Sequence, residues 1–150
     1  MIGGLSNIMN KYSLIGSGVV LFLCSMNISA MNDKHDNNIL HPSVQKFVKS
    51  ILAWETGGYY IRVDEVDGKQ YRYTSWGRHK TMHDKPDLIL FRGKLSFEGS
   101  AGNYYYQFIN GQYKYKCDVN VMGNSDAVGF LEVYRDGSLI FAEPVINDLG

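Results

Sequence analysis

Three dipeptides that favour tight β-hairpin turns occur along this 150-residue chain, at Asp67-Gly68, Asn110-Gly111 and Asp136-Gly137. Asn-Gly and Asp-Gly supply the positive φ angles that a two-residue hairpin turn requires. Each dipeptide is flanked by runs rich in aromatic and β-branched residues, which is typical of strands. The sequence therefore predicts three antiparallel hairpins, over residues 59–76, 103–121 and 130–145. A fourth hairpin is predicted from Leu88 to Phe97, around Arg92-Gly93.

The middle hairpin also predicts its own register. If Asn110-Gly111 forms the turn, Ile109 pairs with Gln112, and every second residue from there falls on the same face. One face is then aromatic and the other polar, as in a half-buried antiparallel sheet. The aromatic face carries Tyr104, Tyr106, Phe108, Tyr113, Tyr115 and Cys117. Cys117 is therefore predicted to be a small buried hydrophobic residue and not a nucleophile.

The outer two hairpins are less clear. A two-residue turn at Asp67-Gly68 would place Val63 on the same face as Arg72, and neither face of that hairpin is cleanly polar. Both faces of the last hairpin are apolar, which predicts that both are buried. We expect the N-terminal helix to pack on one of them.

A helix is predicted before the first strand. His41-Pro42-Ser43 resembles a helix start, because proline fits the first turn. Apolar residues then recur at helical spacing, and the pattern ends near Glu55, before Gly57-Gly58. These residues are Val44, Phe47, Val48, Ile51 and Leu52. The predicted fold class is α+β: an N-terminal amphipathic helix packed on a twisted antiparallel sheet of seven or eight strands. We expect a hairpin meander that curls into a half-barrel or splits into a sandwich.

The first thirty residues have the order of a secretory signal peptide. Lys11 precedes an apolar run from Leu14 to Cys24, and small and polar residues follow up to Ala30. The run is shorter than the roughly 20 apolar residues of a spanning helix. The predicted organisation is a signal peptide at 1–30, a flexible polar leader at 31–38 and a single domain at 39–150. This order predicts a periplasmic or secreted protein, with no transmembrane segment after signal cleavage.

Charge and motifs exclude several functions. Residues 31–150 carry fourteen basic and fifteen acidic side chains, a net charge of −1, so generic nucleic-acid binding is not expected. Cys117 is the one cysteine of this part, so no internal disulfide is predicted. The sequence contains no Gly-x-Ser-x-Gly motif and no glycine-rich phosphate loop before a helix. We therefore predict a non-catalytic protein without a cofactor.

One stretch, residues 76–87, concentrates charges between two predicted strands, and such loops often carry function. We predict that it contacts a partner through an aromatic anchor and charged side chains. The predicted contact residues are Trp76, Arg78, His79, Lys80, His83 and Asp84. A metal site at His79, His83, Asp84 and Asp87 is the weaker interpretation, because Gly77 and Pro86 indicate a loop and zinc needs fixed ligands.

These observations favour a binding protein whose partner is another protein of the cell envelope or the exterior. An inhibitor or immunity protein against a cell-envelope-acting enzyme is the most concrete version. The alternative is a β-barrel that binds a carbohydrate or another small ligand. That alternative requires a large apolar cavity lined by Tyr104, Tyr106, Tyr113 and Tyr115. A third option, a small envelope hydrolase, requires a cleft that holds carboxylates or histidines with perturbed pKa values.

Overall fold

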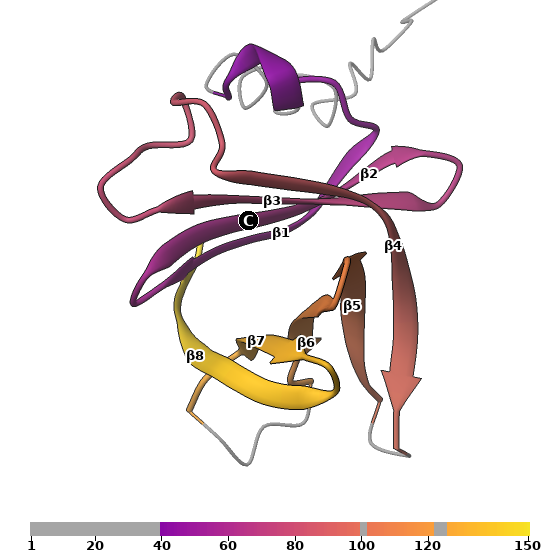
Figure 1. Ribbon diagram of the computed structural model, residues 1–150. Helices are drawn as coiled ribbons and strands as arrows, with labels where there is room; N and C mark the ends of the chain where they lie inside the picture. Colours follow the sequence, from indigo (N-terminus) through magenta and orange to yellow (C-terminus); the bar gives the residue numbers. More distant parts are fainter. Residues whose placement is uncertain (1–39, 100–101, 122–125) are drawn as a thin grey trace, which may run out of the picture.

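The computed structural model describes residues 40–99, 102–121 and 126–150, and these residues form a closed antiparallel β-barrel (Figure 1). Each strand pairs with the next one in the sequence, and the last strand pairs with the first. The strands are β1 (Lys49–Thr56), β2 (Tyr59–Asp67), β3 (Gln70–Gly77), β4 (Leu88–Glu98), β5 (Asn103–Asn110), β6 (Tyr113–Val119), β7 (Gly129–Arg135) and β8 (Ser138–Asp148). No helix in these three ranges is long and apolar enough to cross a membrane. The predicted signal peptide and leader lie outside the described residues.

The predicted N-terminal helix, and with it the α+β class, is wrong. Pro42–Val44 forms a short 3-10 helix, η1, and the next element is strand β1. Leu52 and Trp54 are buried at strand spacing, two residues apart, and the Gly57-Gly58 pair joins β1 to β2. This segment forms a strand and not a helix because, as a strand, it pairs with both β2 and β8. Neither of these strands is then left with an unpaired edge. The antiparallel β structure itself is confirmed.

The middle hairpin keeps its predicted faces although its register differs. Asn110 pairs with Tyr113, so the turn residues are Gly111 and Gln112. This register differs by two residues from the prediction, and a shift of two leaves every side chain on its original face. The burial of Cys117 is confirmed, since none of its side chain is exposed. Burial also raises the pKa of its thiol, which keeps the sulfur protonated and unreactive.

The first hairpin differs from the prediction in its faces: relative to β2, each residue of β3 lies on the face opposite to the predicted one. Its turn residues are Gly68 and Lys69, both with positive φ, which shifts the register by two residues from the prediction. An irregularity between Glu65 and Asp67 then moves it back by one, so the net difference is one residue. Val63 therefore lies opposite Tyr73 instead of sharing a face with Arg72. The predicted faces were wrong because a β-bulge adds one unpaired residue, and one residue inverts the alternation.

The predicted fourth hairpin is a single strand, β4. Arg92 has a φ of 62°, and the pairing with β3 shifts register between Tyr71 and Tyr73, so the strand bulges and bends here. Its first part pairs with β3 and its last part with β5, so β4 passes from one half of the barrel to the other (Figure 1). A Cβ atom on Gly93 would lie 2.2 Å from the Phe108 ring, so this ring packs directly on the glycine at the bend.

The barrel interior is packed with side chains over most of its length. Trp54 lies against Gly129, whose added Cβ would be 2.8 Å from the indole. Towards the end that carries the β2–β3 hairpin, Tyr106 packs against Tyr71 and Tyr104, with ring centroids 4.8 Å and 5.9 Å apart. The buried core comprises Leu52, Trp54, Ile61, Val63, Tyr73, Leu90, Tyr106, Phe108, Cys117, Leu131 and Val145.

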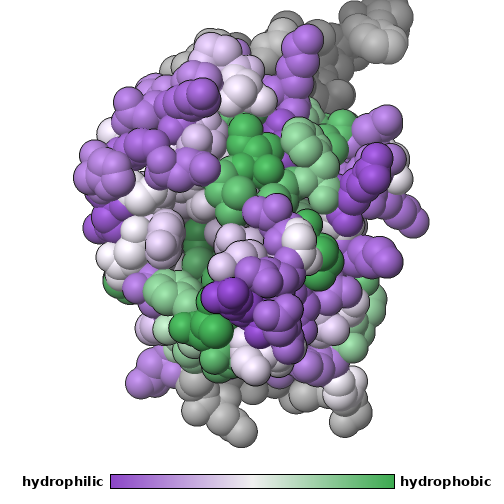
Figure 2. All heavy atoms as spheres, viewed as in Figure 1, coloured by the Kyte–Doolittle hydropathy of each residue, from purple (hydrophilic) through white to green (hydrophobic). Residues whose placement is uncertain are grey.

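The segment 40–48, here called the strap, covers the outer face of β2 and β3 (Figure 1). Leu40 and Val44 pack on Trp76, and Arg72 donates hydrogen bonds to the carbonyl oxygens of Val44 (2.6 Å) and Lys46 (3.0 Å). Contrary to the prediction, no such segment among the described residues covers the last hairpin. Its Leu139 and Ile140 are 52% and 55% exposed. Apolar patches of this kind, bordered by polar residues, also reach the surface in Figure 2.

Candidate functional site

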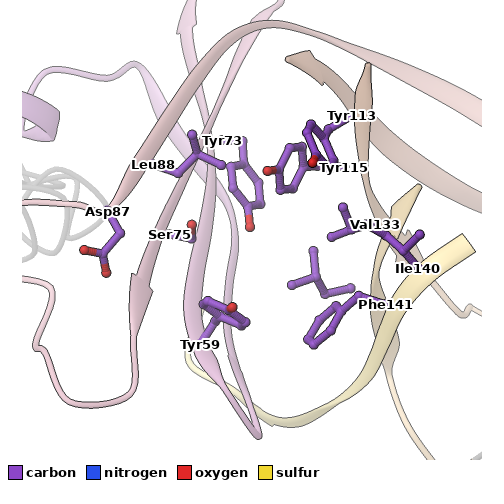
Figure 3. A pocket seen from close by; sticks show the side chains of 11 residues that line it. Tyr59, Tyr73, Ser75, Asp87, Leu88, Tyr113, Tyr115, Val133, Ile140 and Phe141 are labelled. Carbon is purple, nitrogen blue, oxygen red and sulfur yellow. The ribbon is translucent and has the colours of Figure 1, made fainter. Parts of the chain in front are cut away.

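A cavity of about 360 Å³ opens at the end of the barrel that carries the β1–β2, β5–β6 and β7–β8 turns (Figure 3). Strands from both halves of the barrel line it, because inward-pointing residues alternate along each strand. The lining residues are Tyr59, Tyr73, Ser75, Asp87, Leu88, Tyr113, Tyr115, Leu131, Val133, Ile140 and Phe141. This end therefore remains hollow, whereas the opposite end is filled by aromatic rings.

Two pairs of aromatic rings shape the cavity. Tyr59 from β2 meets Phe141 from β8 edge to face, with centroids 5.9 Å apart and ring planes at 83°. Deeper inside, Tyr73 from β3 and Tyr115 from β6 lie 5.6 Å apart. Figure 3 shows the four rings on opposite sides of the space that Leu131 and Val133 border. The cavity thus has rigid aromatic walls held by four different strands.

The cavity is weakly polar. Burial raises the pKa of Tyr73 and of Tyr115, so both hydroxyls stay neutral and can only exchange hydrogen bonds. Asp87 is the single charged lining residue. Its pKa is lowered by Lys80, which forms an ion pair with it, and by the Gly77 N–H, which donates to it at 2.8 Å. One carboxylate with these partners does not make the carboxylate pair that glycoside hydrolysis uses.

The tyrosine cavity expected for a ligand-binding barrel is present in part. Tyr113 and Tyr115 line the cavity. Tyr104 and Tyr106 share their face but lie farther along the barrel, where Tyr71 packs edge to face against Tyr106. The hairpin register thus placed all four on the inward face, but it could not show which end of the barrel is open.

Trp76 and Arg78 of the predicted contact loop are held by the barrel. Trp76 is fully buried beneath the strap, and its Nε1–H donates to the Asp84 carbonyl at 2.8 Å. Arg78 forms an ion pair with Glu55 and lies over the Tyr60 ring, 4.7 Å from its centroid. Trp76 therefore anchors the loop to the fold and leaves no indole surface for a partner.

The remaining loop residues are partly used within the loop. Asp84 accepts hydrogen bonds from the Thr81 N–H (2.8 Å) and hydroxyl (3.0 Å), and Lys80 is paired with Asp87. His79 and His83 are exposed. Within the described residues, no three His, Cys, Asp or Glu side chains are placed to hold a metal ion. The six predicted contact residues therefore do not form one continuous exposed surface, and the contact loop stays a prediction.

The sequence indicated an excess of aromatic residues around Tyr59 and Tyr73 as a possible binding surface, but it did not place them, or Phe141, in the wall of a cavity. The excess of aromatic residues in the first hairpin was a usable signal, since two inward rings in one hairpin need space or a partner. This signal could not be converted into a cavity wall, because the bulges at Val66 and near Ile140 determine which residues point inward. Asp87 joins the cavity from the loop end, where no strand periodicity applies.

Comparison with protein-family models, with curated proteins and with solved structures finds no match for this chain.

Proposed function

We propose that this protein binds one small, largely apolar ligand in the open end of its barrel. The observation that supports this best is the cavity of about 360 Å³, walled by aromatic rings, in a barrel whose opposite end is filled. An eight-stranded barrel either fills with side chains or holds a single small ligand. A concave site with apolar walls and few polar groups is the usual form of a small-molecule site.

The walls favour an apolar ligand over a carbohydrate. Five lining residues offer no side-chain hydrogen bond: Leu88, Leu131, Val133, Ile140 and Phe141. A sugar would lose the hydration of its hydroxyl groups on this wall without gaining replacement bonds, which costs free energy for each group. The tyrosine and serine hydroxyls among the lining residues suffice for one or two oriented hydrogen bonds. An aromatic or short aliphatic molecule with one polar end matches this distribution.

Export, absence of catalysis and a protein partner stay predictions. The signal peptide at 1–30 lies outside the described residues. A protein partner would have to use exposed side chains of the predicted contact loop, such as His79 and His83, or the apolar patches of the barrel exterior. We favour small-ligand binding over a protein partner because a formed cavity supports it.

The test is titration of the purified protein with N-phenyl-1-naphthylamine, a neutral aromatic probe whose fluorescence rises in apolar surroundings. We expect one saturable site with a Kd of roughly 0.2 mM or tighter, at about 0.3 kcal/mol for each non-hydrogen atom. Val133→Phe fills the cavity and should weaken binding at least about tenfold, by overpacking the site. Val128→Phe adds the same atoms at an exposed position and should bind like wild type.

Linear, unsaturable titration, or equal affinity in the two phenylalanine variants, would refute the proposal. Circular dichroism of both variants establishes that each remains folded, so that weaker binding reports the cavity itself.

A further inference from the structure

We infer that the cavity selects a neutral or cationic ligand and rejects an anionic one, with a cationic group placed beside Asp87. This inference rests on the proposed function, because it names the chemical class of the ligand at the same site. It follows from the charges that line the cavity and from those at its rim.

None of the eleven lining residues is lysine, arginine or histidine, and Asp87 is the one charged residue among them. A carboxylate or phosphate entering the cavity would leave water without meeting a cationic partner. It would also approach the Asp87 carboxylate, and the neutral tyrosine hydroxyls could offer it hydrogen bonds but no positive charge. Entry of an anion is therefore opposed by both desolvation and like charge.

Two cations near the rim, Lys80 and Arg135, are already paired. Lys80 forms its ion pair with Asp87, and Arg135 lies 3.8 Å from the Asp136 carboxylate. Arg135 also lies over the ring of Tyr113, 5.8 Å from its centroid, but it does not line the cavity. Neither side chain thus offers an uncompensated positive charge to a bound anion.

The aromatic walls suit a cation. Ring faces carry negative electrostatic potential, and an ammonium group within about 6 Å of a ring centroid is attracted to it, more strongly where water is excluded. Elsewhere in this protein, Arg78 lies over Tyr60 and Lys114 over Tyr134, at 4.7 Å and 4.1 Å. Among the residues that the structure describes, no such cation lies over Tyr59, Tyr73, Tyr115 or Phe141, four rings of the cavity wall. These rings are available to a cationic ligand.

Asp87 fixes where the charge of that ligand would lie. Figure 3 shows Asp87 on the same side of the cavity as Ser75 and Leu88, across from Ile140 and Phe141. An ammonium group at Asp87 would share the carboxylate with Lys80, whose flexible stem allows it to move aside. The apolar part of the ligand would then extend towards the Val133 and Phe141 wall.

The experiment compares three ligands that share one naphthyl group: neutral 2-naphthylmethanol, cationic (2-naphthylmethyl)trimethylammonium and anionic 2-naphthylacetate. Isothermal titration calorimetry of the full chain should give a Kd about tenfold lower for the cation than for the anion, with the alcohol between them. Asp87→Asn should reduce the preference for the cation about threefold. Asp67→Asn makes the same charge change at the opposite end of the barrel, so it should leave the preference unchanged.

Equal or tighter binding of 2-naphthylacetate would overturn the inference while the proposed function stands. A preference for the cation that is the same in Asp87→Asn and wild type would overturn the placement beside Asp87. Absence of binding by all three compounds would instead refute the proposed function, so the two failures are distinguishable.

Discussion

Asp64 is the residue on which the outer face of the first hairpin depends. Its side chain has no exposed surface and forms ion pairs with Arg62 and Arg72, each at 2.8 Å. Arg72 in turn holds the strap through two of its carbonyl oxygens. One buried carboxylate is thus shared by two buried guanidinium groups and, through Arg72, connects the strap to the barrel.

Replacing Asp64 by Asn should therefore destabilise the protein strongly. The change preserves the shape of the side chain but leaves both arginines buried without a counter-charge, which typically costs about 3–5 kcal/mol. Urea unfolding, followed by circular dichroism, measures this free energy. The matched control, Asp67→Asn, lies in an exposed turn and should leave the free energy of unfolding unchanged. A loss of less than about 1 kcal/mol in Asp64→Asn would contradict this expectation, because it would show that the two buried arginines do not depend on the Asp64 charge.

The raised pKa of Tyr106 predicts that the free energy of unfolding decreases with pH in the alkaline range. Burial, helped by the neighbouring Tyr71 and Tyr104, raises its pKa from 10.0 to about 12. The unfolded chain therefore loses this proton at a lower pH than the folded chain. The contribution of Tyr106 to stability is complete below pH 10 and falls as the pH rises towards 12. Buried Tyr73 and Cys117 have raised pKa values and act in the same direction.

We expect urea midpoints to fall between pH 9 and pH 12, and to fall less steeply in Tyr106→Phe, which lacks the ionisable hydroxyl. Tyr105→Phe, at a partly buried position on the opposite face of β5, serves as the comparison. Equal slopes in wild type and Tyr106→Phe would contradict the assignment to this residue.

At the scale of the element, the bend in β4 is the feature that lets one strand serve both halves of the barrel. Gly93→Ala would place a methyl group 2.2 Å from the Phe108 ring, and overpacking of this kind costs about 1–3 kcal/mol. Shortening the ring should relieve the clash. The double variant Gly93→Ala/Phe108→Leu should therefore be more stable than the sum of the two single losses allows. Additive losses, measured by urea unfolding, would show that the backbone itself requires glycine.

The elements also show how far the sequence could be interpreted. Turn dipeptides located three hairpins to within one or two residues, because Gly68, Gly111 and Gly137 adopt the positive φ that these turns require. Bulges at Val66, Arg92 and Ile140 were not foreseen, since no residue type is obligatory for an extra unpaired residue. Each bulge inverts the faces that follow it, so burial could not be predicted beyond it.

The segment 44–55 was misassigned for a related reason. Its apolar residues satisfy a helical spacing, but Leu52 and Trp54 equally satisfy the spacing of a strand. Local periodicity therefore did not distinguish a helix from a strand. The segment forms a strand because β1 pairs with the otherwise open edges of β2 and β8. The cavity was foreseeable only in outline for the same reason. An inward tyrosine face is a local property, whereas an open end depends on how eight strands close.

At the scale of the whole molecule, the barrel has one short seam. β8 pairs with β7 from Ser138 to Pro144, but β8 and β1 share only three residue pairs. The seam is supplemented by a hydrogen bond from the Gly58 N–H to Glu143 and one from the Asn147 side chain to Glu55, both 2.9 Å long. The short pairing makes the seam the weakest contact between neighbouring strands, and it ends near the Tyr59–Phe141 rim of the cavity.

A disulfide across this seam tests both the closure of the barrel and the route of the ligand. Glu55 and Asn147 lie opposite each other, so Glu55→Cys/Asn147→Cys brings two thiols together and closes a loop of about 90 residues. Oxidation should raise the free energy of unfolding by about 3–4 kcal/mol relative to the reduced form of the same variant, chiefly by restricting the unfolded chain. Cys117, buried and protonated, should remain outside the reaction.

In stopped-flow experiments, the association rate of N-phenyl-1-naphthylamine should be the same in the oxidised and reduced forms of this variant, because the cavity already opens at the end of the barrel. A rate that drops several-fold on oxidation would instead place the entrance at the seam and make opening of the barrel part of binding.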